Sequence, residues 1–157
     1  MNIHAQATII INSGIESVFD ASIDSHTLAK CFTGYKNIAA VLSIKTVDGL
    51  PIREGSTRIV DNSNGMCIEE VILSLKRPDS YEYQLCKGFK PPFSWLIRTA
   101  SAKWSYETLD SQTKVTWDYY FEPLNSFSYL VFRLVVERQF QQALEICLRN
   151  LKQSIEE

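Results

Sequence analysis

An arginine and a glutamate in the stretch GSTRIVDNSNGMCIEEVI, residues 55–72, have the types and spacing to form a polar site. Runs rich in β-branched residues flank residues 62–65 (NSNG), which favour a turn, so the stretch predicts a β-hairpin. A three-residue loop centred on Asn64 would place Arg58 opposite Glu70. A register shifted by one residue would place Arg58 opposite Glu69 instead.

The direction of these two side chains decides what they can do. If Arg58 and Glu70 point into the protein, they must pair, because an unpaired buried charge is very costly. A buried Glu70 could also serve as a general acid or base, with a pKa tuned by its surroundings. If both point to solvent, they form a surface pair worth about 0.2–1 kcal/mol. The apolar residues of the hairpin do not choose between the two faces.

Aromatic side chains alternate along three expected strands and so fall on one face of each. That face is expected to point toward the rest of the protein, either as packed core or as the wall of a cavity. In a cavity, tyrosine and tryptophan would present an apolar body with a polar tip. The aromatic residues on this face are Tyr81, Tyr83, Trp104, Tyr106, Trp117, Tyr119 and Phe121.

Arg98 falls in phase with Trp104 and is a second cationic candidate. Within an apolar wall, its guanidinium could bind a ligand carboxylate or phenolate through two parallel hydrogen bonds. The alternative is an arginine at the strand end, at the mouth of a cavity. Nothing places His4 or His26 beside a nucleophile, so acid–base chemistry would fall to Glu70 or a tyrosine.

The elements that must position these residues begin with a strand and two short helices. Residues 4–12 (HAQATIIIN) are rich in β-branched residues and predict the first strand. Ser13 and Glu16 have the spacing of a capping box, which predicts a helix starting at Gly14. Asp24 or Ser25 can cap a second short helix.

Six further strands and one long helix are expected after these. Short turns between consecutive strands indicate an antiparallel sheet. Residues 126–157 contain no Gly or Pro, and their apolar residues recur every three or four positions, which predicts one helix of about 28 residues. That helix must bury its apolar stripe against the sheet. The expected strands are residues 38–47, 57–61, 66–75, 81–86, 94–109 and 114–121, and the stripe is Phe132, Val136, Phe140, Ala143, Cys147 and Leu151.

Composition narrows the class of protein. The chain has 157 residues, of which 45% are hydrophobic, and we expect a single domain over residues 1–157. A net charge of −2 does not suggest a nucleic-acid partner. No apolar segment reaches the about 20 residues of a membrane span, and no secretory signal is apparent, so a cytoplasmic protein is expected.

Four cysteines are spread along the chain without the clustering that a zinc site needs. We expect all four to be buried free thiols in a reducing cytoplasm. The sequence therefore predicts neither a metal nor a cofactor, and it leaves the protein as a monomer or a homodimer. The four residues are Cys31, Cys67, Cys86 and Cys147.

Four short motifs follow in order: IESVFD at residues 15–20, GSTR at 55–58, Asn64-Gly65 with Glu70, and TKVTW at 113–117. Their order and spacing resemble the START-like superfamily, also called SRPBCC, and most closely its polyketide cyclase/dehydrase-related branch. The resemblance covers essentially the whole chain. It implies an α+β helix-grip fold: a seven-stranded antiparallel sheet wrapped around a long C-terminal helix, with two short helices after the first strand and a deep apolar cavity.

The resemblance also implies a function. We expect a small hydrophobic or amphipathic ligand, such as a lipid, quinone, sterol or polyketide, between the sheet and the C-terminal helix. One alternative is a cyclase or dehydratase that uses Glu70 or a tyrosine as acid/base, and another is a protein-interaction module such as a chaperone co-activator. The expected ligand-binding residues are Arg58, Glu70, Tyr83, Arg98, Trp104, Trp117, Tyr119, Phe132, Val136 and Phe140.

The loop at residues 87–93 (KGFKPPF) places two aromatic residues beside two lysines. As exposed side chains, Phe89 and Phe93 could form a lid or touch a membrane surface transiently. A plain solvated loop is the other interpretation.

Overall fold

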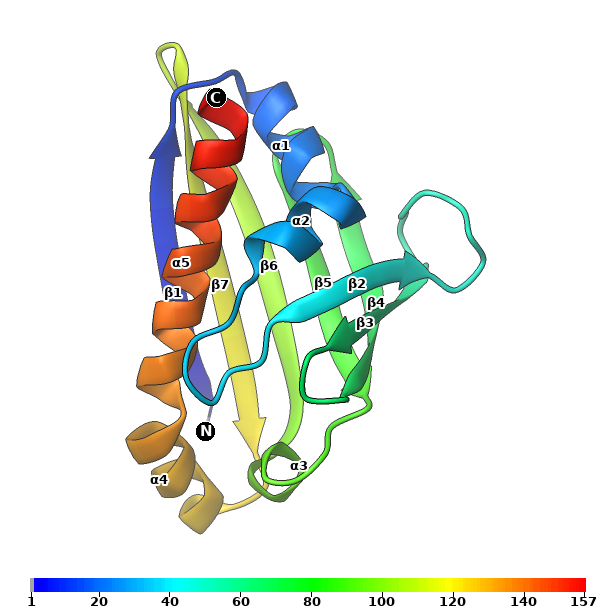
Figure 1. Ribbon diagram of the computed structural model, residues 1–157, viewed down its shortest axis with the longest axis vertical. Coiled ribbons are helices and arrows are strands. Elements are labelled where there is room, and N and C mark those ends of the chain that lie inside the picture. The colour runs from blue at the N-terminus through cyan, green and yellow to red at the C-terminus, as the bar shows by residue number, and fades with distance from the viewer. Residues whose placement is uncertain (1) are drawn as a thin grey trace.

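A seven-stranded antiparallel sheet curves around a long C-terminal helix in the computed structural model, which describes residues 2–157 (Figure 1). The strands lie in the order β1-β7-β6-β5-β4-β3-β2, so neighbours along the chain pair from β2 to β7 and β1 returns beside β7. This confirms the predicted helix-grip fold. The strands are β1 (Ile3–Ile11), β2 (Val41–Thr46), β3 (Thr57–Asn62), β4 (Cys67–Lys76), β5 (Ser80–Lys87), β6 (Ile97–Leu109) and β7 (Gln112–Pro123).

Two short helices, α1 (Ile15–Ile23) and α2 (Ser25–Cys31), follow the first strand as expected. Asp24 caps α2, because its side chain accepts a hydrogen bond from the backbone N–H of Thr27 at 2.9 Å. The capping box predicted for α1 does not form, since its N-cap is Gly14 and no side chain caps it. A further single turn, α3 (Phe93–Leu96), occupies what the sequence predicted to be the start of β6.

The C-terminal segment forms two helices, α4 (Ser126–Val135) and α5 (Glu137–Glu156), where one helix was predicted. The hydrogen bonds continue through the junction at Val136, so the change is a kink, and the segment has no Gly or Pro to signal it. Each helix packs on different partners: α4 on α3 and β7, and α5 on β1 and α2. In Figure 1, α5 runs along the sheet while α4 turns away at its end.

The burial of the cysteines follows the alternation of the strands. Cys31 and Cys147 are buried free thiols, as predicted, but Cys67 and Cys86 are exposed free thiols, so the prediction was wrong for these two. In β4 and β5 the even-numbered and odd-numbered residues respectively face inward, which leaves Cys67 and Cys86 on the outer face.

None of the helices among residues 2–157 has both the length and the apolar character needed to cross a membrane.

Gly88 lets the chain after β5 pass close to β4. Its φ of +105° lies in the region that favours glycine, and a Cβ there would lie 2.0 Å from the backbone oxygen of Cys67. Gly49 also has a positive φ, +74°, but a Cβ on it would meet nothing within 4 Å. A side chain at position 49 would therefore add backbone strain alone, whereas one at position 88 would add both strain and steric overlap.

Gly49→Ala should lower the free energy of unfolding by about 1–2 kcal/mol, the usual cost of a left-handed alanine. Gly88→Ala should lower the free energy of unfolding by clearly more, because the new Cβ would also overlap with the backbone of β4. Urea denaturation of the two variants measures the difference. Equal losses would show that β4 and the loop move apart without cost.

Candidate functional site

Arg58 and Glu70 form an ion pair inside the protein. They lie directly opposite each other in the β3–β4 register, as the three-residue loop predicted. Only 2% of Arg58 and 6% of Glu70 are exposed. Arg58 Nε donates a hydrogen bond to Glu70 Oε1 at 2.8 Å. Both side chains therefore point into the protein, which is one of the two directions that the sequence left open.

Tyrosines from the next strand surround the pair. The guanidinium carbon of Arg58 lies 4.6 Å from the ring centre of Tyr83 and 5.9 Å from that of Tyr81, both on β5. Burial raises the pKa of the Glu70 carboxyl above its ordinary value of 4.5, and the Arg58 guanidinium opposes that rise. Burial likewise raises the pKa of Tyr83 well above its ordinary value, so its hydroxyl stays protonated.

The pair opens onto a cavity of about 110 Å³ between the sheet and the helices. Arg58 and Glu70 are the only charged residues among those that line it. The other polar groups of the wall come from Asn62, Tyr83, Trp117 and Tyr119, and the rest of the lining is apolar. The apolar and aromatic residues are Leu28, Phe32, Ile38, Ala39, Val41, Ile44, Val60, Met66, Ile68, Leu85, Phe89, Phe93, Ile97, Phe121 and Phe140.

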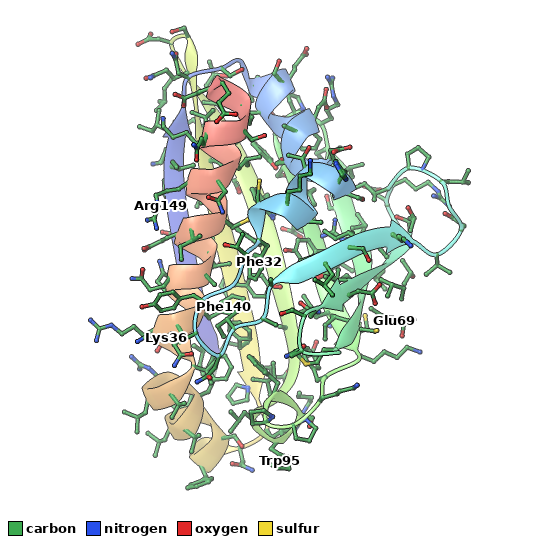
Figure 2. All side chains as sticks on the ribbon, in the orientation of Figure 1. Phe32, Lys36, Glu69, Trp95, Phe140 and Arg149 are labelled. Atoms are coloured by element: carbon green, nitrogen blue, oxygen red, sulfur yellow. The ribbon has the colours of Figure 1, made fainter. Side chains whose placement is uncertain are left out.

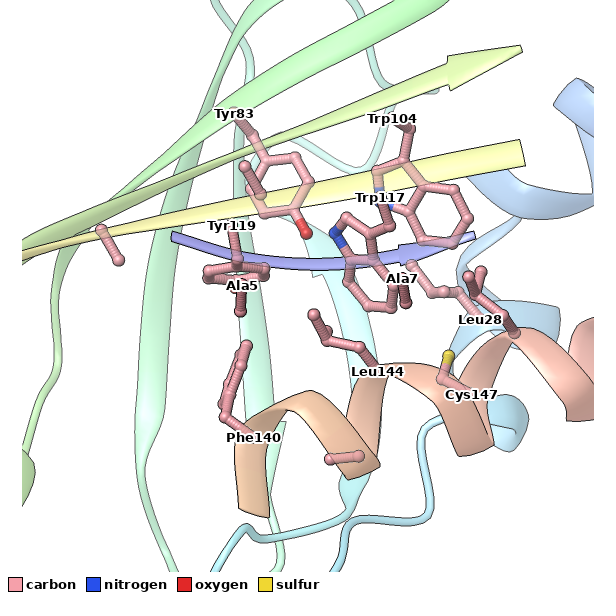
Figure 3. Close-up of a cluster of buried hydrophobic side chains, with 14 of the residues drawn as sticks. Ala5, Ala7, Leu28, Tyr83, Trp104, Trp117, Tyr119, Phe140, Leu144 and Cys147 are labelled. Carbon is pink, nitrogen blue, oxygen red and sulfur yellow. The ribbon is translucent and has the colours of Figure 1, made fainter. Parts of the chain in front are cut away.

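Aromatic rings from the sheet pack against the helix beside this cavity. Figure 3 shows Tyr83, Tyr119 and Trp117 on the strand side, opposite Phe140 and Leu144 of α5. The ring centres of Tyr119 and Phe140 are 4.8 Å apart in an edge-to-face arrangement. The wall is therefore built by side chains from β5, β7 and α5 together.

Two lining residues carry a buried N–H group that has no hydrogen-bond partner among residues 2–157: Nη1 of Arg58 and Nε1 of Trp117. Buried donors are normally satisfied, because an unsatisfied one costs about 1–3 kcal/mol. Both residues line the same cavity, whereas Tyr81 and Trp104, which carry the other two buried polar atoms without a partner among the described residues, do not. Among residues 2–157, no group of three His, Cys, Asp or Glu side chains gathers as metal ligands would.

The predicted binding residues divide into three groups. Six line the cavity: Arg58, Glu70, Tyr83, Trp117, Tyr119 and Phe140. Trp104, Phe132 and Val136 are buried in the core but do not line the cavity. Trp104 instead stacks on Trp117, with ring centres 4.3 Å apart.

Arg98 does not belong to the site. Its side chain is 63% exposed and lies 3.9 Å from Glu122, so the interpretation as a cation within the wall was wrong. The β6–β7 register shifts between Ile97 and Thr99, which breaks the alternation on which the prediction relied. Ile97 is buried there and lines the cavity instead.

Phe89 and Phe93 are half-buried and line the cavity, so the prediction of two exposed aromatic residues in this loop was wrong. Lys90 Nζ donates a hydrogen bond to the backbone oxygen of Gly65 at 3.1 Å, which ties the loop to the tip of the β3–β4 hairpin. Phe32 was not predicted as a site residue; it follows α2, lines the cavity and packs edge-to-face on Trp117. No periodicity marks a single loop residue as part of a site.

The sequence profile of the family described as "Polyketide cyclase / dehydrase and lipid transport" matches residues 2–156. The chain belongs to this family. The match spans nearly the whole sequence and confirms the resemblance to the START-like superfamily. No curated protein matches the chain.

Solved structures share the fold at low sequence identity. Ara h 8.0201 is 15% identical, with a TM-score of 0.67 and 99% of each chain covered. Major latex-like protein 151 from Panax ginseng is 21% identical, with a TM-score of 0.61, 90% of this chain and 96% of that chain covered. TTHA0849 from Thermus thermophilus is 16% identical, with a TM-score of 0.68, 98% of this chain and 97% of that chain covered. At these identities the likeness establishes the fold alone.

Arg58→Met should lower the free energy of unfolding by about 3–5 kcal/mol at neutral pH, because it leaves Glu70 buried without its cation. In the variant, burial alone acts on the pKa of Glu70 and raises it further above 4.5. A carboxyl whose pKa is raised by folding stabilises the fold at acid pH and loses that contribution as pH rises. Urea unfolding should therefore show a deficit, relative to the unchanged protein, that grows from acid to neutral pH.

The double variant Arg58→Met/Glu70→Leu is the matched control, because it removes both charges and leaves none unpaired. It should recover most of the lost stability and should not show the growing deficit. A deficit of the same size at every pH in Arg58→Met would mean that lost packing, and not the orphaned carboxyl, causes the destabilisation.

Proposed function

We propose that the protein binds a small hydrophobic or amphipathic molecule in the cavity between the sheet and α5. The observation that carries this proposal is an aromatic cavity with two lining residues, Arg58 and Trp117, that each carry a buried N–H group without a partner among residues 2–157. A ligand that filled the space would cover apolar surface and satisfy these donors at once. The description of the family, which includes lipid transport, supports the same class of ligand.

The charge of the site favours a ligand with a neutral oxygen acceptor, such as a ketone or quinone carbonyl. Glu70 already neutralises Arg58, so a carboxylate would bring an uncompensated negative charge into an apolar space. A hydrocarbon would leave both N–H groups unsatisfied. Quinones and polyketide-like molecules meet both conditions better than fatty acids do.

The size of the cavity favours a compact ligand or one compact part of a longer one. Its volume of about 110 Å³ is below the ~300–1,000 Å³ of pockets for drug-sized molecules. Phe89 and Phe93 line it from a loop and a single helical turn, which are easier to displace than strands. A sterol would need such a displacement, whereas one or two fused rings would not.

1,4-Naphthoquinone and naphthalene test this proposal, because they have the same ring system and differ in the two carbonyl groups. Calorimetric titration should show tighter binding of the quinone. Trp117→Phe keeps an aromatic wall but removes the indole N–H, and should weaken quinone binding by about five- to tenfold. Trp95→Phe, on an exposed tryptophan, is the control and should change nothing. Binding of neither compound, or equal binding of both, would contradict the proposal.

A second candidate function is catalysis of the cyclase or dehydratase type. Glu70 favours it, because a cavity carboxyl whose pKa burial raises above its ordinary value is a candidate general acid or base. Glu70→Gln should then leave affinity for a polyketide-like substrate within about threefold and abolish its turnover. Product analysis of a short poly-β-ketone substrate with both proteins gives the answer. No turnover by the unchanged protein would leave binding as the function.

A further inference from the structure

Apolar side chains gather in solvent at one end of the molecule, on α3, on α4 and at the residue that follows β7. We call these residues the end patch. Leu134 is 84% exposed, Phe127 75% and Trp95 67%, which is unusual for such large apolar groups. Figure 2 shows Trp95 at this end of the molecule. The end patch consists of Trp95, Leu124, Phe127, Leu130, Leu134 and Val135.

The backbone under the end patch is well held. Ser128 Oγ donates a hydrogen bond to the Trp95 backbone oxygen at 3.1 Å, and the N–H of Leu124 donates to the oxygen of Leu96, also at 3.1 Å. Asn125 caps α4 by accepting a hydrogen bond from the N–H of Ser128 at 2.8 Å. These bonds fix α3 against the start of α4, so the apolar side chains are held outward by ordered structure.

The exposed residues of α4 follow helical spacing. Phe127, Leu130 and Leu134 are three and four positions apart and so share one face. The opposite face carries Ser128 and Phe132, which are buried against the rest of the protein. Since α4 is apolar on both faces, the outward one has no partner among residues 2–157 and needs one from outside.

Positive charge predominates in the sequence segments that carry the end patch. Residues 87–98 and 122–141, which carry α3, α4 and their flanks, hold five Lys or Arg side chains against two Glu, in a chain of net charge −2. Glu69 on β4 pairs with one of the five, Lys87, at 3.0 Å, so the local charge is +2. Glu122 and Glu137 partly neutralise Arg98 and Arg133. Lys90 and Arg138 have no carboxylate partner among the ion pairs of the described residues. The cations are Lys87, Lys90, Arg98, Arg133 and Arg138.

We propose that the end patch docks the protein onto an anionic lipid surface. A helix with one outward apolar face and cationic flanks is suited to lie in the interface of a bilayer, with its apolar side chains among the acyl chains. Trp95 suits the headgroup level, where tryptophan and tyrosine gather. Anionic headgroups complement the local charge of +2.

A second copy of the chain fits this surface less well. A two-fold interface would bring two ends of charge +2 together, and like charges facing each other oppose association. A nucleic acid would match the charge but would leave the six apolar side chains without a partner. Of these three occupants, only an anionic lipid surface accepts the apolar groups and the cations together.

The end patch lies one layer of side chains away from the cavity. Phe93 lines the cavity and packs on Phe132, the buried face of α4, with ring centres 6.3 Å apart. Docking would therefore bring the lipid surface close to the aromatic wall of the proposed ligand site. The docking itself does not depend on what the cavity binds.

Co-sedimentation with lipid vesicles tests the proposal. The protein should sediment with vesicles of phosphatidylcholine and phosphatidylglycerol, and less with vesicles of phosphatidylcholine alone. High salt should weaken its binding to the vesicles that contain phosphatidylglycerol. Phe127→Ser/Leu134→Ser should weaken binding to the anionic vesicles by at least about tenfold, because it removes two large apolar groups from the lipid contact. Leu73→Ser is the matched control, an exposed leucine on β4 away from the end patch, and should bind normally.

Two further measurements keep the outcomes distinct. Naphthoquinone affinity of Phe127→Ser/Leu134→Ser should be unchanged, so that failure of docking and failure of the ligand proposal can be told apart. Light scattering should show that end-patch residues do not hold a dimer together. No sedimentation with anionic vesicles, or a dimer that dissociates on Phe127→Ser, would overturn the proposal.

Discussion

Two ionised side chains can remain inside an apolar core only as long as they stay together, and this constraint governs how the sheet is built. Arg58 comes from β3 and Glu70 from β4, and their hydrogen bond needs those strands in one register. A shift by one residue would turn one of the charges toward the outer face. The same pair sets the electrical character of the cavity, which contains a dipole but no net charge.

The aromatic residues around the pair connect it to the rest of the protein. Tyr83 stacks against the guanidinium, Tyr119 packs edge-to-face on Tyr83 and on Phe140, and Phe140 belongs to α5. A continuous chain of rings thus links the buried charges on one side of the molecule to the gripped helix on the other. Because densely packed interiors transmit displacements, a molecule that entered among these rings would displace both the sheet and the helix.

The sequence predicted those features that repeat. Alternation placed Tyr83, Trp117 and Tyr119 on the inner face, and the turn at residues 62–65 set Arg58 against Glu70. The sequence could not predict features that depend on an irregularity in a strand or helix. The register shift beside Ile97 sent Arg98 into solvent, and the kink at Val136 turned α4 outward although no Gly or Pro marks it. Loop residues such as Phe89 reach the cavity through tertiary packing, which leaves no periodic signal.

The three tryptophans lie in three different surroundings, and this gives the protein a built-in set of optical reporters. Trp95 stands in solvent on α3, Trp104 is fully buried, and Trp117 lines the cavity. Indole emission moves to longer wavelengths as water gains access, so the three residues should emit in different parts of the spectrum. Proteins that retain one tryptophan each would report separately on the outer end, the interior and the ligand space, without any attached dye.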